Sequence, residues 1–327
     1  MSDGAPSDPG RERILVGAAA TSAYAMPLAV TLRSLVTNLS SGRSVTCYVL
    51  HGGLSEPDQR RVTESCAGAD VEFHWIRMDD SGLRGLPSWG PNYAAYYCLF
   101  LPQYLAETVR TAIWLESDMV IVRDIGELWQ QDPRPHALLA AQDLVVPHVS
   151  SACGVQQFRE LGLEPDRKYF NSGVMVINLD WWRQNSVTNR VLSYLRRRGS
   201  SVHLADQGGL NAVLCGQWGE LDPRWNVIES VAGRCFFKAP HLSEQQYRLV
   251  VEDPWIIHYA GLFKPWRGHM LTPARGLFFR YLDLTAWKGW RPRATLSAIL
   301  AGIYERRLRD RLYPLERFCW SFRNRWN

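Results

Sequence analysis

Two acidic residues one position apart, Glu116 and Asp118, interrupt an apolar stretch near the middle of the 327-residue chain. Residues 112–115 and 119–122 on either side are apolar, which indicates a buried strand that breaks for two carboxylates and then resumes. Carboxylates at i and i+2 of an extended segment point the same way, so both can bind one hard divalent cation beside phosphate oxygens. Taken alone, the tripeptide also fits an exposed strand end with two solvated acids.

A second group of candidate residues follows the short apolar strand expected at residues 256–257. The strand ends in His258, Gly261 allows close backbone approach, and Lys264 is held by the stiff Pro265 after it. Imidazole can complete an oxygen-rich Mn²⁺ site, and an ammonium group suits a phosphate. In a chain that already offers paired acids, this spacing favours a metal and phosphate site over a structural histidine.

Polar side chains stand beside core residues at two further points. Asn171 opens an Asn-Ser-Gly sequence that reads as a turn before a core strand, and it is either a structural turn residue or a reader of ligand hydroxyls. Asp206 and Gln207 lie at an apparent helix start, where Asp206 could equally be a helix N-cap. The local pattern leaves both choices open.

The N-terminal part alternates strands and helices, and it must position these residues. Strands are predicted at residues 14–19, 45–51 and 71–76, and helices at 26–39, 57–66 and 94–105. This order indicates right-handed crossovers and a largely parallel sheet, which binds ligands outside the carboxyl ends of its strands. The loop with Ala19, Thr21 and Tyr24 falls on that edge, as does the acidic turn. Tyr24 is interpreted as a base-stacking or a packing residue.

Composition limits the class of protein. A chain that is 46% hydrophobic and 21% charged can form one large domain or two small ones. The first loop lacks both GxGxxG and GxxxxGK[ST], which counts against a dehydrogenase or a P-loop enzyme. Seven dispersed cysteines fit a reducing compartment, residues 1–13 lack the apolar core of a signal peptide, and no run is long enough to span a bilayer. We therefore expect a cytoplasmic protein.

The basic charge of the chain belongs to its C-terminal end. Residues 291–327 contain nine arginines against three acids, a charge of +6, which leaves about −1 of the formal +5 for residues 1–290. Nucleic-acid binding by the core is therefore not expected. Apolar residues recur every four positions from Leu296 to Leu312, followed by Phe and Trp alternating with Arg. The segment 293–327 fits peripheral contact with an anionic membrane at the inner face, packing on the catalytic domain, or a homodimer contact.

Read together, five motifs resemble the family 8 retaining glycosyltransferases, which include glycogenin and the bacterial lipooligosaccharide galactosyltransferases. In chain order they are AAYYCLFLP (94–102), WLESD (114–118), YFNSG (169–173), Asp206-Gln207 and HxxGxxKPW (258–266). The resemblance implies an α/β GT-A fold with a single Rossmann-like, mixed and mostly parallel sheet. It also implies a UDP-hexose donor (glucose or galactose), Mn²⁺ with Mg²⁺ as the alternative ion, and transfer with retention. The expected organisation is a flexible N-terminus (1–13), a catalytic domain (14–275) and a helical C-terminal extension (276–327).

The resemblance also assigns roles to residues. It implies Glu116, Asp118 and His258 as metal ligands and Lys264 at the diphosphate. It places Asp206 and Gln207 at the catalytic centre, with Gln207 near the anomeric carbon, and gives donor contacts to Ala19, Thr21, Tyr24, Ser117, Asp143, Asn171, Asp206 and Gly261. Because an amide is a poor nucleophile, we favour same-face substitution in which the leaving phosphate accepts the proton of the acceptor hydroxyl. The acceptor hydroxyl is expected on a saccharide, a lipid-linked glycan or a small molecule.

Three positions depart from the family pattern. Glu116 stands where aspartate is usual, Cys98 where arginine is usual, and Thr21 where an aspartate usually helps to read uracil. These differences keep two alternatives open: a sugar nucleotide other than a UDP-sugar, and a catalytically silent relative that binds a nucleotide-sugar or glycan. A nucleotidyltransferase or sugar-phosphate enzyme on a similar α/β sheet also uses paired acids and a metal, and it is a third alternative. The presence of both the metal-side and the sugar-side residues favours an active hexosyltransferase.

Overall fold

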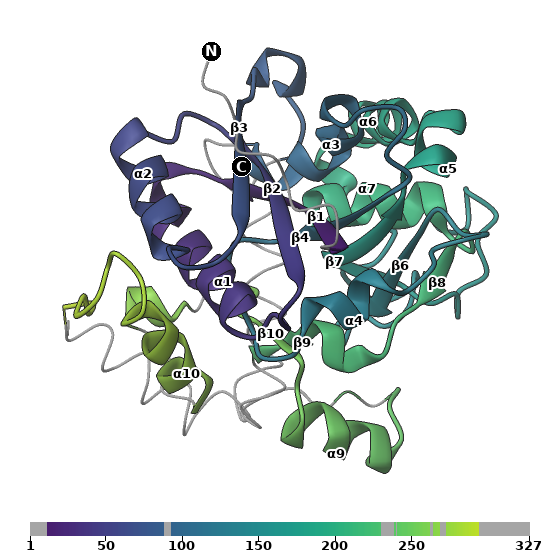
Figure 1. The fold of residues 1–327 in the computed structure, drawn as a ribbon. Coiled ribbons are helices and arrows are strands. Elements are labelled where there is room, and N and C mark those ends of the chain that lie inside the picture. The colour runs from purple at the N-terminus through teal and green to yellow at the C-terminus, as the bar shows by residue number, and fades with distance from the viewer. Residues whose placement is uncertain are drawn as a thin grey trace.

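A computed structural model of the chain describes residues 12–87, 93–229, 239, 241–261, 264–268 and 273–293. Within these residues a seven-stranded sheet forms the centre of the molecule, and a three-stranded sheet lies beside it (Figure 1). The order of the large sheet is β3-β2-β1-β4-β7-β6-β8, and that of the small sheet is β5-β10-β9. The mixed, mostly parallel sheet expected from the sequence is confirmed, whereas the small sheet was not foreseen.

The strands of the large sheet are β1 (Glu12–Ala20), β2 (Arg43–His51), β3 (Val71–Arg77), β4 (Thr111–Leu115), β6 (Leu138–Gln142), β7 (Phe170–Asn178) and β8 (Trp218–Glu220). Those of the small sheet are β5 (Met119–Ile121), β9 (Val227–Ile228) and β10 (Ile256–His258). Strand β1 pairs in parallel with β2 and β4, whereas β7 runs antiparallel to both of its neighbours. The amino end of β7 therefore lies at the edge where β4 and β6 have their carboxyl ends.

Helices cover both faces of the large sheet (Figure 1). One face packs against α1 (Ala25–Thr37), α2 (Glu56–Ser65), α4 (Ile125–Trp129) and α10 (Pro273–Leu282). The other packs against the 3₁₀ helix η3 (Ala94–Phe100), α3 (Leu101–Tyr104), α5 (Leu179–Gln184), α6 (Val187–Arg198) and α7 (Ala205–Leu214). Alternate residues of a strand point to opposite faces, which is why Val16 and Ala18 of β1 join the first core while Leu15 packs against the second. Helix α9 (Glu244–Glu252) packs on a smaller cluster.

Helix α1 hydrogen-bonds to β5 along the strand edge that faces it. The hydroxyl of Thr31 donates to the carbonyl of Met119 and accepts from its amide, both at 3.0 Å, and the hydroxyl of Ser34 accepts from the amide of Ile121 at 2.9 Å. These side chains are fully buried. They satisfy main-chain groups that have no strand partner on that side and fix β5 relative to the large sheet.

The segment 94–105 differs from the helix predicted for it. Its first seven residues form the 3₁₀ helix η3, and α3 begins afresh at Leu101 with Pro102 in its first turn. The run of buried side chains in η3 is anchored by hydroxyl bonds, from Tyr96 to the carbonyl of Pro87 and from Tyr97 to Asp80. The helix predicted over 94–105 is therefore present as two consecutive shorter helices, of which the first is a 3₁₀ helix.

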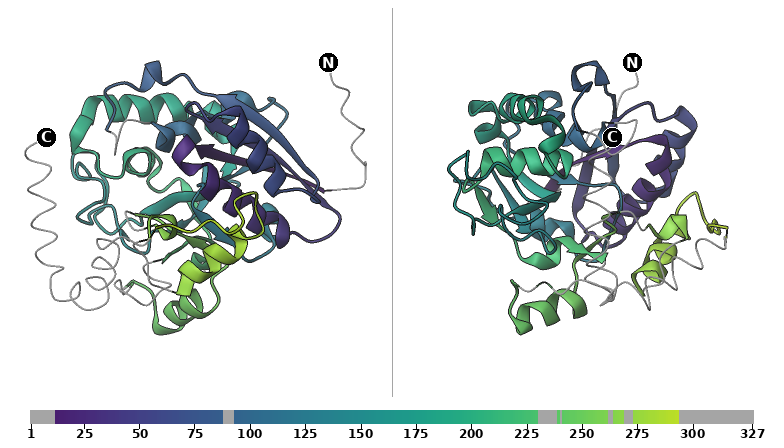
Figure 2. Two further views of the ribbon diagram at one scale, coloured as in Figure 1. Left: turned by 90° about the vertical axis from the view of Figure 1, so that its left-hand side faces the viewer. Right: turned by 180° about the vertical axis from the view of Figure 1, so that it is seen from behind.

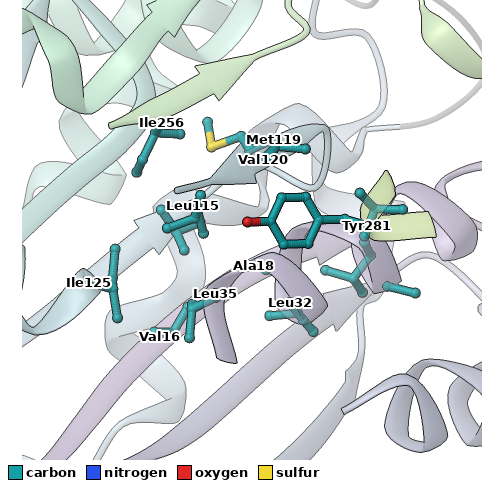
Figure 3. Packing of buried hydrophobic residues seen from close by; sticks show 14 of the residues in the cluster. Val16, Ala18, Leu32, Leu35, Leu115, Met119, Val120, Ile125, Ile256 and Tyr281 are labelled. Atoms are coloured by element: carbon teal, nitrogen blue, oxygen red, sulfur yellow. The ribbon is translucent and has the colours of Figure 1, made fainter. Parts of the chain in front are cut away.

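The expected domain boundary at residue 276 falls inside α10. Tyr281 of this helix lies among Leu32, Met119 and Val120 in the main core (Figure 3), and its hydroxyl accepts a hydrogen bond from Asn38 at 2.8 Å. Both views of Figure 2 show α10 alongside α1. The chain through Trp287 therefore packs with the catalytic core, and the boundary is corrected accordingly. At the other end, β1 already includes Glu12 and Arg13, so the sheet begins two residues before the predicted start of the domain.

Segments 1–11 and 294–327 lie outside the described residues, so the predictions of a flexible N-terminus and of a basic, aromatic helix stay predictions. Among the helices that the structure does describe, none combines the length and the apolar character needed to cross a bilayer.

Candidate active site

A pocket of about 470 Å³ opens where β1 and β4 end. Its lining gathers most of the residues that the sequence nominated, namely Ala19, Thr21, Tyr24, Glu116, Ser117, Asp118, Asp206, Gln207, Gly261 and Lys264. Tyr24 lines the pocket and also packs edge-on against Trp266, with ring centroids 5.6 Å apart, so the two interpretations of Tyr24 are compatible. Residues far apart in the chain thus share one cavity at the predicted edge of the sheet.

Backbone pairing explains why the two acids sit at this edge. Strand β4 ends at Leu115, and the amide of Glu116 donates to the carbonyl of Gly173 in β7 at 2.9 Å. The carbonyl of Asp118 in turn accepts from the amide of Tyr259, which follows β10, at 2.9 Å. The turn 116–118 therefore passes from the large sheet to the small one, and His258 at the end of β10 is brought beside it.

Glu116, Asp118 and His258 form a cluster suited to a cation. One ligand atom from each lies within 4.8 Å of the others. His258 Nε2 is 2.8 Å from Glu116 Oε2 and 3.3 Å from Asp118 Oδ1, yet this buried nitrogen forms no aligned hydrogen bond. Two carboxylates and an imidazole whose Nε2 faces both of them match the donor set of a divalent metal such as Mn²⁺. The residues present therefore fit the predicted ion.

The electrostatics of the cluster point the same way. Burial lowers the pKa of His258, but the charges of Asp118 and Glu116 outweigh burial and raise it to about 9. Burial would also raise the pKa of Asp118, whereas Lys264 and His258 hold it well below its ordinary value. Without a metal ion, the positive charges of these two side chains stabilise a carboxylate that is only 5% exposed.

Lys264 bonds inside the cluster. Its Nζ donates to Asp118 Oδ2 and to the carbonyl of Tyr259, both at 2.5 Å, and its side chain is 6% exposed. Burial lowers the pKa of Lys264, but the charge of Asp118 outweighs it and the net shift is upward. The diphosphate contact predicted for this residue stays a prediction, and it requires the ammonium group to turn from Asp118 towards the pocket.

Asp206 and Gln207 stand in the first turn of α7. The N-cap position belongs to Leu204, so the N-cap interpretation of Asp206 was wrong. Leu204 and Ala205 both have left-handed backbone angles, with φ of 57° and 47°, a conformation that costs roughly 1–3 kcal/mol per non-glycine residue and is often found at functional sites. Both residues line the pocket, as do the two polar side chains after them.

The surroundings of Asp206 favour its neutral form. Its Oδ2 accepts from the hydroxyl of Ser172 at 3.0 Å and from the thiol of Cys98 at 3.7 Å. Burial, and secondly the charge of Glu116, raise the pKa of Asp206 to about 8. Burial likewise raises the pKa of the Cys98 thiol. A small uncharged group thus contacts Asp206 at the position where the sequence pattern had suggested an arginine.

Asp143 and Asn171 lie one layer behind the pocket wall. Asp143 Oδ2 accepts from the amides of Asn171 at 2.8 Å and of Gln207 at 3.0 Å, and Gln207 Oε1 accepts from the amide of Ser172 at 3.1 Å. Asn171 belongs to β7 itself, so the turn predicted before the strand is part of the strand. Neither Asp143 nor Asn171 is among the residues that line the pocket. Their direct contacts with the sugar donor stay predictions. In the structure Asp143 bonds to Gln207 and to Asn171.

Three residues of the site were not assigned a role from the sequence. Ser172 bonds to Asp206, Arg267 lines the pocket near Tyr24, and Asn226 accepts from or donates to His258 Nδ1 at 2.9 Å. Arg267 directly follows the KPW motif, and its charge was the one available signal. The other two are common polar residues whose partners lie far away in the chain, so no local pattern marks them.

The mixed sheet with an acid-x-acid turn and a histidine at its edge defines a GT-A fold. The chain belongs to glycosyl transferase family 8, whose model matches residues 16–269. It is therefore a glycosyltransferase, and the nucleotidyltransferase alternative is set aside.

Known proteins resemble the chain over most of its length. General stress protein A of Bacillus subtilis (strain 168) is 30% identical over 268 residues, which cover 81% of this chain and 91% of that protein. The lipopolysaccharide 1,2-glucosyltransferase of Escherichia coli (strain K12) is 24% identical and covers 84% and 79%. The structure of the galactosyltransferase LgtC in complex with donor and acceptor sugar analogs matches with a TM-score of 0.71 at 20% identity, over 88% of this chain and all of that one. The structural match supports the fold.

Proposed function

We propose that the protein transfers a neutral hexose, glucose or galactose, from a UDP-sugar to a hydroxyl group of a saccharide, lipid-linked or small-molecule acceptor, with retention of anomeric configuration. The observation that carries the proposal is the meeting, in one pocket, of the two acids of the Glu116, Asp118 and His258 cluster with a polar wall that includes Ser172, Asp206 and Gln207. Relatives named as a glucosyltransferase and as a galactosyltransferase with donor and acceptor analogs support a hexose and a sugar acceptor.

The pocket divides into a diphosphate end and a sugar end. Glu116, Asp118 and His258 would hold Mn²⁺, with Mg²⁺ as the alternative, and the histidine favours Mn²⁺. A bound divalent ion neutralises the charge that grows on the leaving diphosphate. Lys264 and Arg267 line the same side and would add positive charge there.

The sugar end supports an uncharged hexose. Lys264 and Arg267 are the cations among the described residues that line the pocket, and both belong to the diphosphate end. The wall around Asp206 offers Ser172 and Gln207 instead, next to the acidic Glu116, and the buried thiol of Cys98 contacts Asp206. A donor sugar with a carboxylate would meet no cation among the described residues of this wall, so a uronic acid donor should be strongly disfavoured.

Gln207 is suited to stabilise the reacting sugar rather than to attack it. Its amide is fixed at both ends, by Asp143 and by the amide of Ser172, and an amide is a weak nucleophile. In the reaction proposed, the acceptor oxygen bonds to the anomeric carbon on the face from which the phosphate oxygen leaves. The proton of the acceptor hydroxyl passes to that phosphate oxygen. Gln207 Oε1 and Asp206 line the side on which positive charge grows.

The test is donor turnover by the full chain. Purified protein is incubated with UDP-, GDP-, ADP- and dTDP-hexoses and with UDP-glucuronic acid, each with Mn²⁺ and with EDTA, while nucleotide release and thermal shift are followed. Mn²⁺-dependent turnover of one UDP-hexose, and none of the uronate, is expected. Preference for another base would mean that Thr21 marks a changed donor. No turnover and no stabilisation with any donor would favour the catalytically silent relative.

Two further proposals concern where the enzyme acts. We expect a cytoplasmic protein whose segment 293–327 contacts anionic membranes, and a homodimer contact is the alternative use of that segment. Flotation with anionic liposomes should be lost when residues 294–327 are deleted. Equal flotation of both proteins would contradict the membrane contact, and a mass change in light scattering would favour the dimer.

A further inference from the structure

Two buried asparagines connect the metal-binding cluster to the sugar wall. Asn226 lies between Asn171 and His258: its Nδ2 donates to Asn171 Oδ1 at 2.8 Å, and its Oδ1 is 2.9 Å from His258 Nδ1. Asn226 is 1% exposed and is the last residue of the 3₁₀ helix η5 (Pro223–Asn226), directly before β9. Nothing in the reaction proposed above uses it.

The orientation of each amide in this chain of bonds is fixed by a main-chain donor. The amide of Gly173 can only donate, and it donates to Asn171 Oδ1 at 2.9 Å. Asn171 Nδ2 then faces the carboxylate of Asp143, its proper acceptor, at 2.8 Å. If the Asn171 amide were flipped, its Nδ2 would face the N–H of Gly173, and two donors would meet. The hydrogen bond from Gly173 therefore determines the orientation of the Asn171 amide.

The same reasoning determines which ring nitrogen of His258 carries the proton. Because Asn171 presents an oxygen, the Asn226 group facing it must be the donor Nδ2. Asn226 Oδ1 therefore faces His258 Nδ1, and an oxygen there needs a proton on that nitrogen. The neutral ring then has no proton on Nε2, the atom that lies 2.8 Å from Glu116 and 3.3 Å from Asp118.

We propose that Asn226 is a positioning residue for the metal site, which through Asn171 and the Gly173 amide holds His258 in the tautomer that offers Nε2 to the ion. The inference rests on the proposed metal-dependent function. Metal-ligating histidines commonly donate their other ring N–H to an outer acceptor, and loss of such a partner typically costs about 10–100-fold in metal affinity. Here the acceptor is the side-chain amide of Asn226. Its orientation is set, through two successive hydrogen bonds, by the backbone N–H of Gly173.

The first test reads the tautomer without metal or substrate. Long-range ¹⁵N NMR of ¹⁵N-histidine-labelled, metal-free protein, recorded where the ring is neutral, should show the His258 proton on Nδ1, the nitrogen that faces Asn226 Oδ1. Asn226→Ala should give a mixture of both tautomers. Asn226→Asp keeps an acceptor for Nδ1 and should retain the wild-type tautomer, although it loses the donor that bonds to Asn171 Oδ1. A proton on Nε2 in the wild type would overturn the proposal.

The second test measures Mn²⁺ binding by electron paramagnetic resonance in the same proteins. Asn226→Ala should weaken Mn²⁺ binding about 10–100-fold, and Asn226→Asp should stay within about threefold of the wild type. Asn211→Ala is the matched control, since Asn211 is also 1% exposed and hydrogen-bonded but lies off the relay, with the main chain of Phe170 and Gln207. Equal affinity in Asn226→Ala and the wild type would overturn the proposal. If the wild type bound no Mn²⁺, the proposed metal-dependent function would be contradicted. The NMR spectrum would still test whether the hydrogen bonds from Gly173 through Asn171 and Asn226 fix the tautomer of His258.

Discussion

Lys264 Nζ donates to Asp118 Oδ2 at 2.5 Å, so the lysine expected at the diphosphate is paired with a residue expected to bind the metal. Both side chains are almost fully buried. A cation bound at Asp118 would take over the charge that Lys264 supplies there, and the ammonium group could then turn to a phosphate. Metal and donor are therefore expected to bind in a coupled way, with the ion first.

Lys264→Met should lower the stability of the metal-free protein by up to about 3–5 kcal/mol, because it leaves the Asp118 carboxylate buried without its closest cation. Saturating Mn²⁺ should restore part of the loss. Urea unfolding with EDTA and with Mn²⁺ measures both effects. Lys168→Met is the control: its pair with Glu220 is half exposed and should contribute less than about 1 kcal/mol. Similar losses in the two variants would contradict the role given to Lys264.

Asp206→Asn should stabilise the protein increasingly as pH rises. The folded-state pKa of about 8 lies above the ordinary 3.8, so the stability gained from protonated Asp206 is fully present below pH 3.8 and is lost as pH rises to 8. The difference between variant and wild type should grow by at most about 1.4 kcal/mol per pH unit over this window. Urea unfolding at pH 5 and pH 7.5 without metal is the measurement. A difference that does not change with pH would mean that Asp206 is ionised.

Gly173→Ala should weaken Mn²⁺ binding. The added Cβ would lie 2.5 Å from His258 Cε1 and 2.9 Å from Asn171 Oδ1, so the ring or the relay must move, and overpacking of this kind costs about 1–3 kcal/mol. Gly276→Ala in α10 is the matched control, because its Cβ would meet nothing within 4 Å. That exposed helical position should gain about 0.5–1 kcal/mol. Manganese titration and thermal unfolding separate the two variants, and unchanged binding in Gly173→Ala would contradict the packing argument.

Thr31→Val should destabilise the protein by roughly 2–4 kcal/mol, since it removes the partner of both main-chain groups of Met119 in a buried place. Because Met119 follows Asp118, metal affinity should fall as well. Thr37→Val on the same helix removes an exposed hydroxyl bond to Arg33 and should change stability by less than about 0.5 kcal/mol. Chemical unfolding and metal titration test both, and an equal effect of the two changes would contradict the anchoring of β5.

The parallel half of the fold could be predicted well from the sequence. Strands β1 to β3 and helix α1 begin and end within two residues of their predicted bounds. Strands β1 and β2 are covered on both faces, and such a strand is a nearly continuous apolar run in the sequence. The core strand after Gly173 was predicted, but the start of β7 at Phe170 was not, since Asn171 and Ser172 look like a turn until Asp143 and Asp206 supply partners from elsewhere in the chain. Polar residues inside a buried strand are readable only with their partners in place.

The site was predictable where motifs are short and charged. Glu116, Asp118, His258 and Lys264 were nominated from their spacing and do meet. The relay through Asn226 was not, because its bonds join residues 55 and 32 positions apart and asparagine is common in loops. The raised pKa of Asp206 could not be predicted from the sequence either, since it depends on burial that only the packed structure creates.

The turn 116–118 has a mechanical consequence. Glu116 follows β4 of the large sheet, Asp118 directly precedes β5 of the small sheet, and His258 ends β10, so one ion bound to all three would link the two sheets. A chelator would then weaken the contact between the two sheets as well as abolish activity. Limited proteolysis should therefore cut the metal-stripped protein faster around β9 and α9. Chelating agents in a purification buffer would have the same effect on the small sheet.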